Sequence, residues 1–258
     1  QKKLIYSISQ ATLFGRDITF DQFGKYNLRI RKTLEAVYKH YQGESTDYEF
    51  QALGEYLKQV WFASGIHHHY ACDKFIPSFT EQFFRDAVLS VDKKQLPLRE
   101  NEDVNELLNE LCPVIFDPTI HPKRVNKADG VDLICTSACN YYEGVNQQEV
   151  ENYYAKMKAE GPDSEQPSYG LNSTLIKKGN SVCEDVWKAD GKYGAAIKQI
   201  IVWLERAKAF TENEQQHKVI SLLIKYYETG DLRDFDRYSI EWLHEQDGMI
   251  DFINGFIE

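Results

Sequence analysis

The sequence predicts an α+β fold that is predominantly α-helical, with helices packed around a small β-structure. Apolar residues recur at spacings of three and four over most of the chain, which is the period of an amphipathic helix. Two shorter stretches nearly alternate apolar and polar residues, as half-buried strands do. The 258 residues are 42% hydrophobic and 13% aromatic, which is enough apolar material for a folded body.

We expect residues 1–258 to form a single globular region in three stretches. The first, 1–125, is helical, and the second, 126–190, holds the small β-structure with one helix. The third, 191–258, is helical again. One clear loop lies at 160–168, where chain-breaking and charged residues concentrate. That loop is too short to be a linker between domains.

Five helices are predicted from periodicity and start signals. Residues 27–41 carry apolar side chains at spacings of three and four, and Gly43 follows as a stop. Possible capping boxes, in which Ser, Thr or Asn precedes Glu by three positions, open the other four. These pairs are Thr46 with Glu49, Ser78 with Glu81, Asn146 with Glu149, and Thr211 with Glu214. We expect the last two helices to end near Gly161 and Gly230.

The strand candidates are residues 131–144 and 169–177, where apolar residues nearly alternate. Residues 182–187 are a third candidate. Because a helix separates the first two stretches, they could pair in a small sheet while helices make most of the body.

Charge and composition exclude several classes of partner. Forty acidic against thirty basic side chains give a net charge of −10, which repels phosphate backbones and disfavours nucleic acid. No stretch reaches the roughly 18 apolar residues of a membrane span, so we expect no membrane partner. Five cysteines without a Cys-x-x-Cys pair favour free thiols. We therefore expect a cytoplasmic protein, with a periplasmic one still open.

A run of three histidines suggests a metal site, with two further donors close by. The run is His67, His68 and His69, and the donors are Cys72 and Asp73. Consecutive residues point in different directions on a strand or a helix, so three adjacent histidines seldom converge on one ion. The alternative, which we favour, is local hydrogen bonding and packing in a buried loop. We therefore assign no metal ligands here.

The sequence His244-Glu245 begins like the zinc-peptidase motif His-Glu-x-x-His, but Gly248 stands where the second histidine is required. We interpret this stretch as a helix end running into Gly248. Nucleophile elbows, phosphate loops and dinucleotide-binding turns are also missing from the sequence, so we assign no catalytic residue. Three tyrosine pairs could line a ligand groove, although aromatic residues more often fill cores: Tyr141–Tyr142, Tyr153–Tyr154 and Tyr226–Tyr227.

Several long phrases closely resemble the dipeptidyl peptidase III family of zinc exopeptidases, and its bacterial branch most of all. They are Gly-Arg-Asp-Ile-Thr-Phe-Asp-Gln-Phe at 15–23, Asn-Tyr-Tyr-Glu-Gly-Val at 140–145, Ser-Tyr-Gly-Leu-Asn-Ser at 168–173 and Gly-Phe-Ile-Glu at 255–258. The loop 65–77 adds the family pattern Gly-x-x-His-His-Tyr-x-x-Asp-Lys-Phe-x-Pro.

The resemblance implies a two-lobed enzyme around a wide cleft, of which this chain is part of the non-zinc lobe. The family's zinc motif His-Glu-x-x-Gly-His and its catalytic tyrosine have no counterpart here, and the final phrase leads into that tyrosine in the family. The earlier part of such enzymes includes a small β-structure that receives the substrate backbone. Glu258 matches the family's glutamate that holds the free N-terminus of the peptide, a suitable task for a carboxylate.

The resemblance therefore implies a fragment of an enzyme that removes dipeptides from the N-terminus of oligopeptides. We expect it to be inactive alone, with zinc only in the full-length parent. Its partners would be oligopeptides and the missing zinc-bearing lobe. Two alternatives stay open, namely a stand-alone peptide-binding module and a structural helical interaction domain without catalysis.

Overall fold

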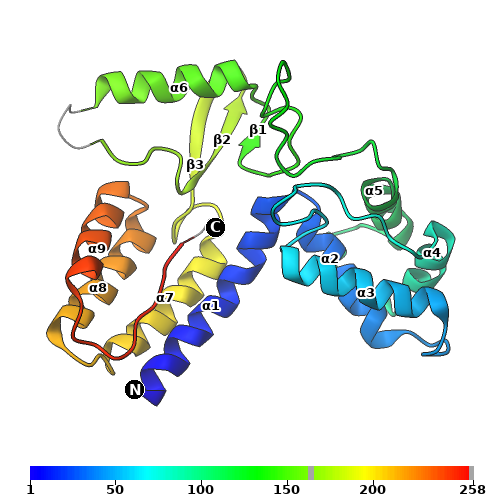
Figure 1. Ribbon diagram of the computed structural model, residues 1–258, viewed down its shortest axis with the longest axis horizontal. Coiled ribbons are helices and arrows are strands. Elements are labelled where there is room, and N and C mark those ends of the chain that lie inside the picture. Colours follow the sequence, from blue (N-terminus) through cyan, green and yellow to red (C-terminus); the bar gives the residue numbers. More distant parts are fainter. Residues whose placement is uncertain (162–165, 256–258) are drawn as a thin grey trace. The chain divides into compact units, whose positions relative to one another are not determined.

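The computed structural model describes residues 1–161 and 166–255 (Figure 1). It consists of helices with one small sheet, so the predicted helical α+β class is confirmed. The chain divides into two compact units, Phe20–Asn140 and Gln1–Thr19 with Tyr141–Glu258. Sequence patterns alone indicate one globular region, whereas each unit has a hydrophobic core of its own. Periodicity shows which face of a helix is buried but not against which helices, so it could not reveal this division.

The unit formed by residues 20–140, here called the helical unit, packs four helices around an apolar core. They are α2 (Asn27–His40), α3 (Tyr48–Ala63), α4 (Glu81–Ser90) and α5 (Val104–Phe116), with the short 3-10 helix η1 (Lys93–Gln95) before α5. The end of α1 (Lys2–Phe23) contributes Phe20 to the same core. Fully buried side chains from the four helices complete it, among them Ile30, Leu34, Leu57, Phe84 and Leu107. Burying each such side chain stabilises the fold by about 1.5–3 kcal/mol.

The second unit, here called the sheet-bearing unit, contains most of α1, four further helices and the sheet. The helices are α6 (Gln147–Glu160), α7 (Gly194–Lys208), α8 (Glu214–Thr229) and α9 (Leu232–His244). Helix α8 packs against both α7 and α9, and its buried face carries Val219, Ile220 and Leu223. No helix in the described ranges is long and apolar enough to cross a bilayer.

Of the four predicted capping boxes, one is present at the start of its helix, and the other three helices are capped by a different residue. Asn146 and Glu149 form the predicted box at the start of α6, and Gly230 ends α8 as expected. The predicted caps Thr46, Ser78 and Thr211 are wrong, because a second capping residue lies one or two positions further along the chain. The residues whose side chains accept the cap hydrogen bonds are Asp47, Thr80 and Asn213. An oxygen of the right reach is common in polar loops, so the spacing alone does not select one.

The sheet has three strands in the order β1-β2-β3, namely β1 (Tyr142–Glu143), β2 (Ser173–Lys178) and β3 (Ser181–Val186). Strand β1 runs parallel to β2, while β2 and β3 form an antiparallel hairpin. The hairpin turns at Gly179, whose φ of 61° lies in the left-handed region that glycine tolerates. The candidates 169–177 and 182–187 thus correspond to β2 and β3.

The first strand candidate, residues 131–144, is wrong over most of its length, because only Tyr142–Glu143 is a strand. The carboxylate of Asp132 accepts hydrogen bonds from the backbone N–H groups of Ile134 and Cys135. The Thr136 hydroxyl donates in turn to the carbonyl of Asp132. Aspartate favours such local turns over an extended ladder, and apolar alternation does not reveal this competition.

Candidate functional site

The residues that follow α9 lie in an extended conformation against the sheet-bearing unit. Residues 249–255, here called the C-terminal segment, have no regular secondary structure, but their burial alternates strictly from one residue to the next. Ile250 and Phe252 are partly buried on the core of this unit, whereas Ile253 between Phe252 and Asn254 is 90% exposed. The segment therefore has the two-sided character of a strand laid on a helical surface.

The start of α8 holds both backbone polar groups of Ile250. Gln216, which is 1% exposed, accepts from the N–H of Glu212 at 2.9 Å and donates to the carbonyl of Ile250 at 2.8 Å. The carboxylate of Glu212 accepts from the N–H of Ile250 at 2.9 Å. The Gln1 side chain and this N–H hold the pKa of the Glu212 carboxyl below its usual value. The side chains of Gln216 and Glu212 thus bond the carbonyl and the N–H of Ile250, as the backbone of a neighbouring strand would in a sheet.

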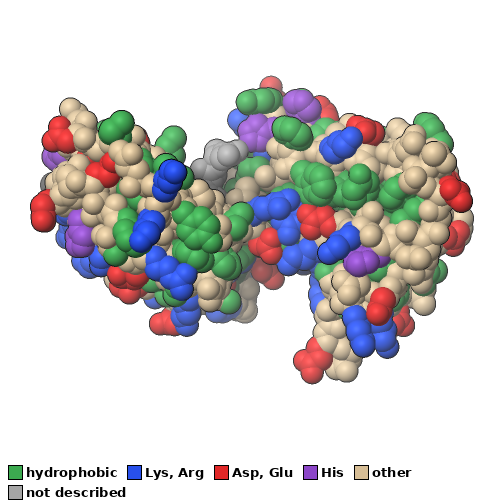
Figure 2. Space-filling model, turned by 90° about the horizontal axis from the view of Figure 1, so that it is seen from below, with side chains coloured by type: hydrophobic (Ala, Val, Ile, Leu, Met, Phe, Trp, Pro, Cys, Tyr) green, Lys and Arg blue, Asp and Glu red, His purple; other side chains and the backbone are tan. Residues whose placement is uncertain are grey.

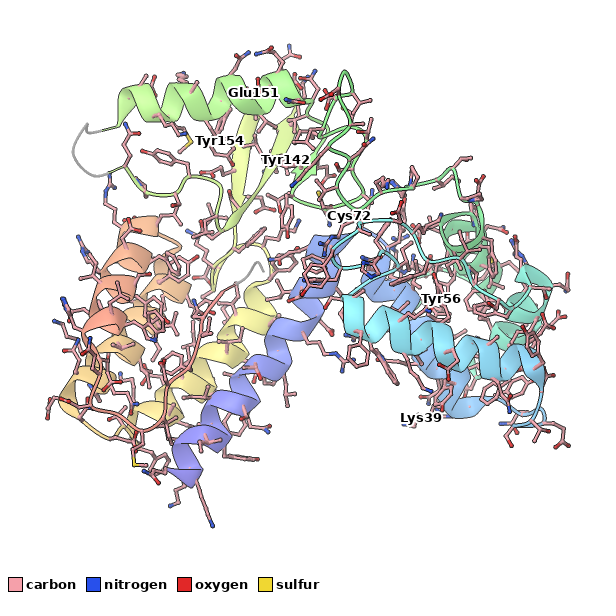
Figure 3. All side chains as sticks on the ribbon, in the orientation of Figure 1. Lys39, Tyr56, Cys72, Tyr142, Glu151 and Tyr154 are labelled. Atoms are coloured by element: carbon pink, nitrogen blue, oxygen red, sulfur yellow. The ribbon has the colours of Figure 1, made fainter. Side chains whose placement is uncertain are left out.

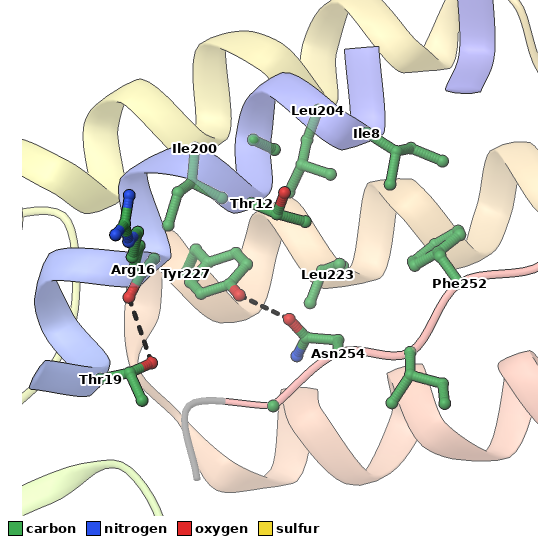
Figure 4. A pocket seen from close by; sticks show the side chains of 14 residues that line it. Ile8, Thr12, Arg16, Thr19, Ile200, Leu204, Leu223, Tyr227, Phe252 and Asn254 are labelled. Carbon is green, nitrogen blue, oxygen red and sulfur yellow. Dashed lines mark hydrogen bonds between the residues drawn. The ribbon is translucent and has the colours of Figure 1, made fainter. Parts of the chain in front are cut away.

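The other end of α8 holds Asn254. The hydroxyl of Tyr227, a residue that is 5% exposed, donates to Asn254 Oδ1 at 2.5 Å (Figure 4). Burial raises the pKa of Tyr227 above its usual value, so its hydroxyl remains protonated and able to donate. Helix α9 contributes a further contact, because Trp242 Nε1 donates to the carboxylate of Asp251, which lies between Ile250 and Asn254 in the sequence, at 2.9 Å.

A pocket of about 230 Å³ lies between this segment and helices α1, α7 and α8 (Figure 4). Most of its lining is apolar, including Ile8, Ile200, Leu204 and Leu223. Thr12, Arg16 and Thr19 of α1 add polar groups. The C-terminal segment forms one wall through residues 252–255.

The sheet carries a second polar arrangement, beneath α6. The carboxylate of Glu184 on β3 accepts from the Ser173 hydroxyl at 2.6 Å and from the Tyr154 hydroxyl at 3.3 Å. Tyr154 points from α6 toward these strands (Figure 3). Burial raises the pKa of Tyr154, which keeps its hydroxyl a donor. Among the described strands, β1 and β3 are the outer ones, and an outer strand is where an extended peptide can add to a sheet.

Comparison with known proteins gives consistent matches. The family model for peptidase family M49 matches residues 140–258. The human protein named dipeptidyl peptidase 3 is 19% identical over 236 residues, covering 83% of this chain and 32% of its own length. The protein of the same name from Nematostella vectensis is 19% identical over 239 residues, with the same coverage. A solved structure of DPP III from Caldithrix abyssi superposes with a TM-score of 0.56 and 15% identity, over 96% of this chain.

The second half of the chain thus matches peptidase family M49, and most of the chain is similar to dipeptidyl peptidase III proteins. The chain spans about a third of the relatives it matches, 32% of the two curated proteins and 33% of the solved structure. The family match begins at residue 140, one residue before the sheet-bearing unit resumes, and so includes the sheet, α8 and the C-terminal segment.

Large apolar side chains lie on the surface of both units. Figure 2 shows apolar side chains gathered in patches among charges of both signs on the face drawn there. Across the described residues, the most exposed large apolar side chains are those of Phe62, Tyr70, Ile253 and Met249.

Glu258, the residue that the resemblance assigns to peptide binding, lies outside the described residues. The description ends at Gly255, three residues earlier, at the end of the C-terminal segment. What the structure adds is the support of that segment by Gln216 and Tyr227, which sequence reasoning missed. A signal was present for each, because Gln216 is a polar residue on the buried face of a helix and Tyr227 belongs to a tyrosine pair.

The three histidines of loop 65–77 engage different partners. His67 is 2% exposed, and its Nε2 lies 2.8 Å from the carbonyl of His121. His68 Nδ1 accepts from the N–H groups of Tyr70 and Ala71. The ring of His69 packs edge-on against the ring of Tyr70. The predicted local hydrogen bonding and packing are present, but the prediction of a buried loop is wrong, because His68 and Tyr70 are exposed while His67 is buried.

The stretch from His244 to Gly248 is the helix end that its sequence suggests. Helix α9 ends at His244, and the carboxylate of Glu245 accepts from the N–H of Gly248 and the side chain of Asn213. In the described part of the chain, no three His, Cys, Asp or Glu side chains are grouped as a metal site requires.

Proposed function

We propose that this chain forms part of the substrate-binding lobe of a zinc-dependent dipeptidyl peptidase, which removes dipeptides from the N-terminus of oligopeptides. The match of residues 140–258 to peptidase family M49 is the observation that carries the proposal. The relatives named dipeptidyl peptidase 3, which match most of this chain, support it. We further propose that the parent enzyme is bacterial.

In the part of the chain that the structure describes, no three His, Cys, Asp or Glu side chains converge as a zinc site requires. A zinc ligand must present an imidazole nitrogen without a proton toward the metal, together with about three converging partners. Nε2 of His67 is used by the carbonyl of His121, and Nδ1 of His68 by two backbone N–H groups. The proposal therefore assigns the metal to the part of the parent enzyme that this chain does not span.

The role proposed for this chain is to bind and orient the peptide. Glu258 would accept hydrogen bonds from the terminal ammonium and so set the cleavage point two residues along the substrate. The outer strands of the sheet would offer backbone groups to the extended peptide. The net charge of −10 favours a cationic terminus electrostatically.

The experiment compares the chain alone with the full-length protein on a dipeptidyl-naphthylamide substrate, with zinc measured by elemental analysis. We expect dipeptide release and one zinc per molecule for the full-length protein only. Release by the chain alone, or a tightly held zinc in it after dialysis, would contradict the assignment of catalysis to the other lobe. Absence of release by the full-length protein would favour a peptide-binding or structural domain.

A further inference from the structure

Two buried side chains of the helical unit each have a polar atom without a hydrogen-bond partner among the described residues. They are Asn27 at the start of α2 and His67 in loop 65–77, both 2% exposed, and the atoms are Asn27 Nδ2 and His67 Nδ1. Proteins seldom leave such an atom unpaired, because burial removes its bonds to bulk water and only another partner replaces them. Both residues line one small pocket within this unit. We propose that the pocket binds one water molecule, which accepts a hydrogen bond from Asn27 Nδ2 and donates one to His67 Nδ1.

Two glycines allow the Asn27 amide to lie at this pocket. A Cβ at Gly24 would lie 2.8 Å from Asn27 Nδ2, and one at Gly65 would clash with the same atom. The amide therefore lies directly against two stretches of backbone, the turn before α2 and the residues that follow α3. The backbone N–H of Asn27 donates to the carbonyl of Gly24 at 2.9 Å, which closes that turn. With backbone on both sides, a partner for Nδ2 must be small enough to enter the space that remains.

The ring of His67 presents a lone pair at Nδ1. Its Nε2 lies 2.8 Å from the carbonyl of His121, which can only accept, so the ring proton is on Nε2. Burial lowers the pKa of His67 to about 4, so the ring is uncharged near neutral pH. Nδ1 therefore requires a donor, whereas Asn27 Nδ2 requires an acceptor.

Charge and size select water as the occupant. A cation would be repelled by the charges of Lys74 and Arg124, which act on His67, and by Lys25, which lines the pocket. An anion would meet the lone pair of His67 Nδ1, to which it has no proton to donate. The pocket has a volume of about 10 Å³, the least that holds a single water. A neutral molecule of this size that both accepts and donates is water.

The bound water would join segments that are far apart in the sequence. Asn27 begins α2, His67 belongs to loop 65–77, and His121, which bonds the other side of the His67 ring, follows α5. A water that bridges two polar groups is nearly as favourable in enthalpy as a direct hydrogen bond. The water would thus hold loop 65–77 against the start of α2. This inference does not depend on the proposed function.

The test combines a high-resolution crystal structure of the 258-residue chain at neutral pH with nitrogen NMR of its histidine side chains in solution. We expect one water within about 2.7–3.2 Å of both Asn27 Nδ2 and His67 Nδ1. The NMR spectra should show a proton on Nε2 of His67 and none on Nδ1.

Asn27→Leu replaces the amide with an apolar side chain of similar size. We expect this variant to lose the water, and the resonance of His67 Nδ1 to shift because its lone pair loses the donor. The matched control is Asn105→Leu, at an exposed asparagine of α5, which should leave the water and the resonance unchanged.

Three results on the wild type would overturn the proposal. They are a direct hydrogen bond between the Asn27 amide and His67 Nδ1 without a water, an ion in the pocket, and a proton on Nδ1. A water that persists in Asn27→Leu with an unchanged Nδ1 resonance would also overturn it, because Asn27 would then not be a partner. The wild-type measurements decide alone if Asn27→Leu does not fold.

Discussion

The side-chain ammonium of Lys74 donates a hydrogen bond to the backbone carbonyl of Val114 across 2.9 Å. It also donates to the carbonyls of Asp117 and Ile120, so three carbonyls at and beyond the end of α5 converge on one charge. Carbonyls in the last turn of a helix have no intrahelical partner and carry partial negative charge. Lys74 therefore closes α5 and ties loop 65–77 to the core of the helical unit, although burial lowers its pKa.

Replacing this ammonium should destabilise the helical unit. We expect Lys74→Met to lower the free energy of unfolding by about 2–3 kcal/mol, since hydrogen bonds to a charged group are lost at a buried position. The control is Lys58→Met on α3, where an exposed ion pair with Glu55 is removed. That change should leave the free energy of unfolding nearly unchanged, because an exposed ion pair contributes little to stability. Urea unfolding measures both, and equal stabilities of the two variants would contradict the account.

His67 should make the helical unit sensitive to acid. Burial lowers the pKa of His67 to about 4, and the charges of Lys74 and Arg124 act in the same direction, against the hydrogen bond to the carbonyl of His121. The unfolded value is about 6.5. Between these values the unfolded chain binds more protons, so the free energy of unfolding should fall as pH drops from about 6.5 to 4, by about 3 kcal/mol.

The comparison that isolates His67 uses His67→Gln, which retains a side-chain donor but does not titrate. Unfolding free energies are measured at pH 7 and pH 4.5 for both proteins. We expect the wild type to lose more stability than the variant, because all other titrating groups are shared. Identical losses would show that His67 is not held neutral in the folded protein.

Thr174 connects the sheet to the core of its unit through one oxygen. Its fully buried Oγ1 accepts from Trp187 Nε1 at 3.1 Å and from Lys192 Nζ at 2.9 Å. Thr174→Val preserves the shape but removes the acceptor of both hydrogen bonds, so we expect a loss of about 2–4 kcal/mol. Thr174→Ser keeps the hydroxyl and should cost about 1 kcal/mol for the lost methyl group. Thermal unfolding ranks the variants, and a serine variant as unstable as the valine variant would contradict this explanation.

Gly15 offers a test of local packing in α1. A Cβ added there meets no heavy atom within 4 Å, whereas one added at Gly54 of α3 would lie 3.0 Å from the ring of Tyr38. Glycine costs about 1 kcal/mol relative to alanine inside a helix. We therefore expect Gly15→Ala to stabilise by about 0.5–1 kcal/mol, and Gly54→Ala to gain less. Chemical unfolding measures the stability of both variants. A Gly15→Ala variant less stable than the wild type would contradict the finding that a Cβ at this position meets no neighbouring atom.

Features set by neighbouring residues were predictable from the sequence, and features set by distant contacts were not. The box of Asn146 and Glu149 is local and was predicted correctly. Asp47, and not the predicted Thr46, caps α3. The side chain of Glu49 does not complete the predicted box but accepts hydrogen bonds from Thr80, 31 residues away. The division into two units has the same origin, since it depends on which helices pack together.

In the candidate site, too, some residues could be named from the sequence and others could not. Glu258 could be named because its phrase resembles a family pattern, and the histidines of loop 65–77 could be set aside by geometry. The roles of Gln216 and Tyr227 depend on contacts with residues 34 and 27 positions later in the chain. A periodic pattern identifies their helix face as buried but does not identify the segment that covers it.

The measurement that tests the account most directly is kcat/KM of Glu258→Gln in the full-length enzyme, on free-amine peptides. A hydrogen bond to a charged group is worth roughly 1.5–3 kcal/mol, so we expect a fall of roughly 10- to 150-fold at about 1.4 kcal/mol per decade. Inhibition by N-acetylated peptides, which offer no ammonium, should be nearly unchanged. A value of kcat/KM within about twofold of wild type would contradict the claim that this chain carries the group that binds the peptide's N-terminus.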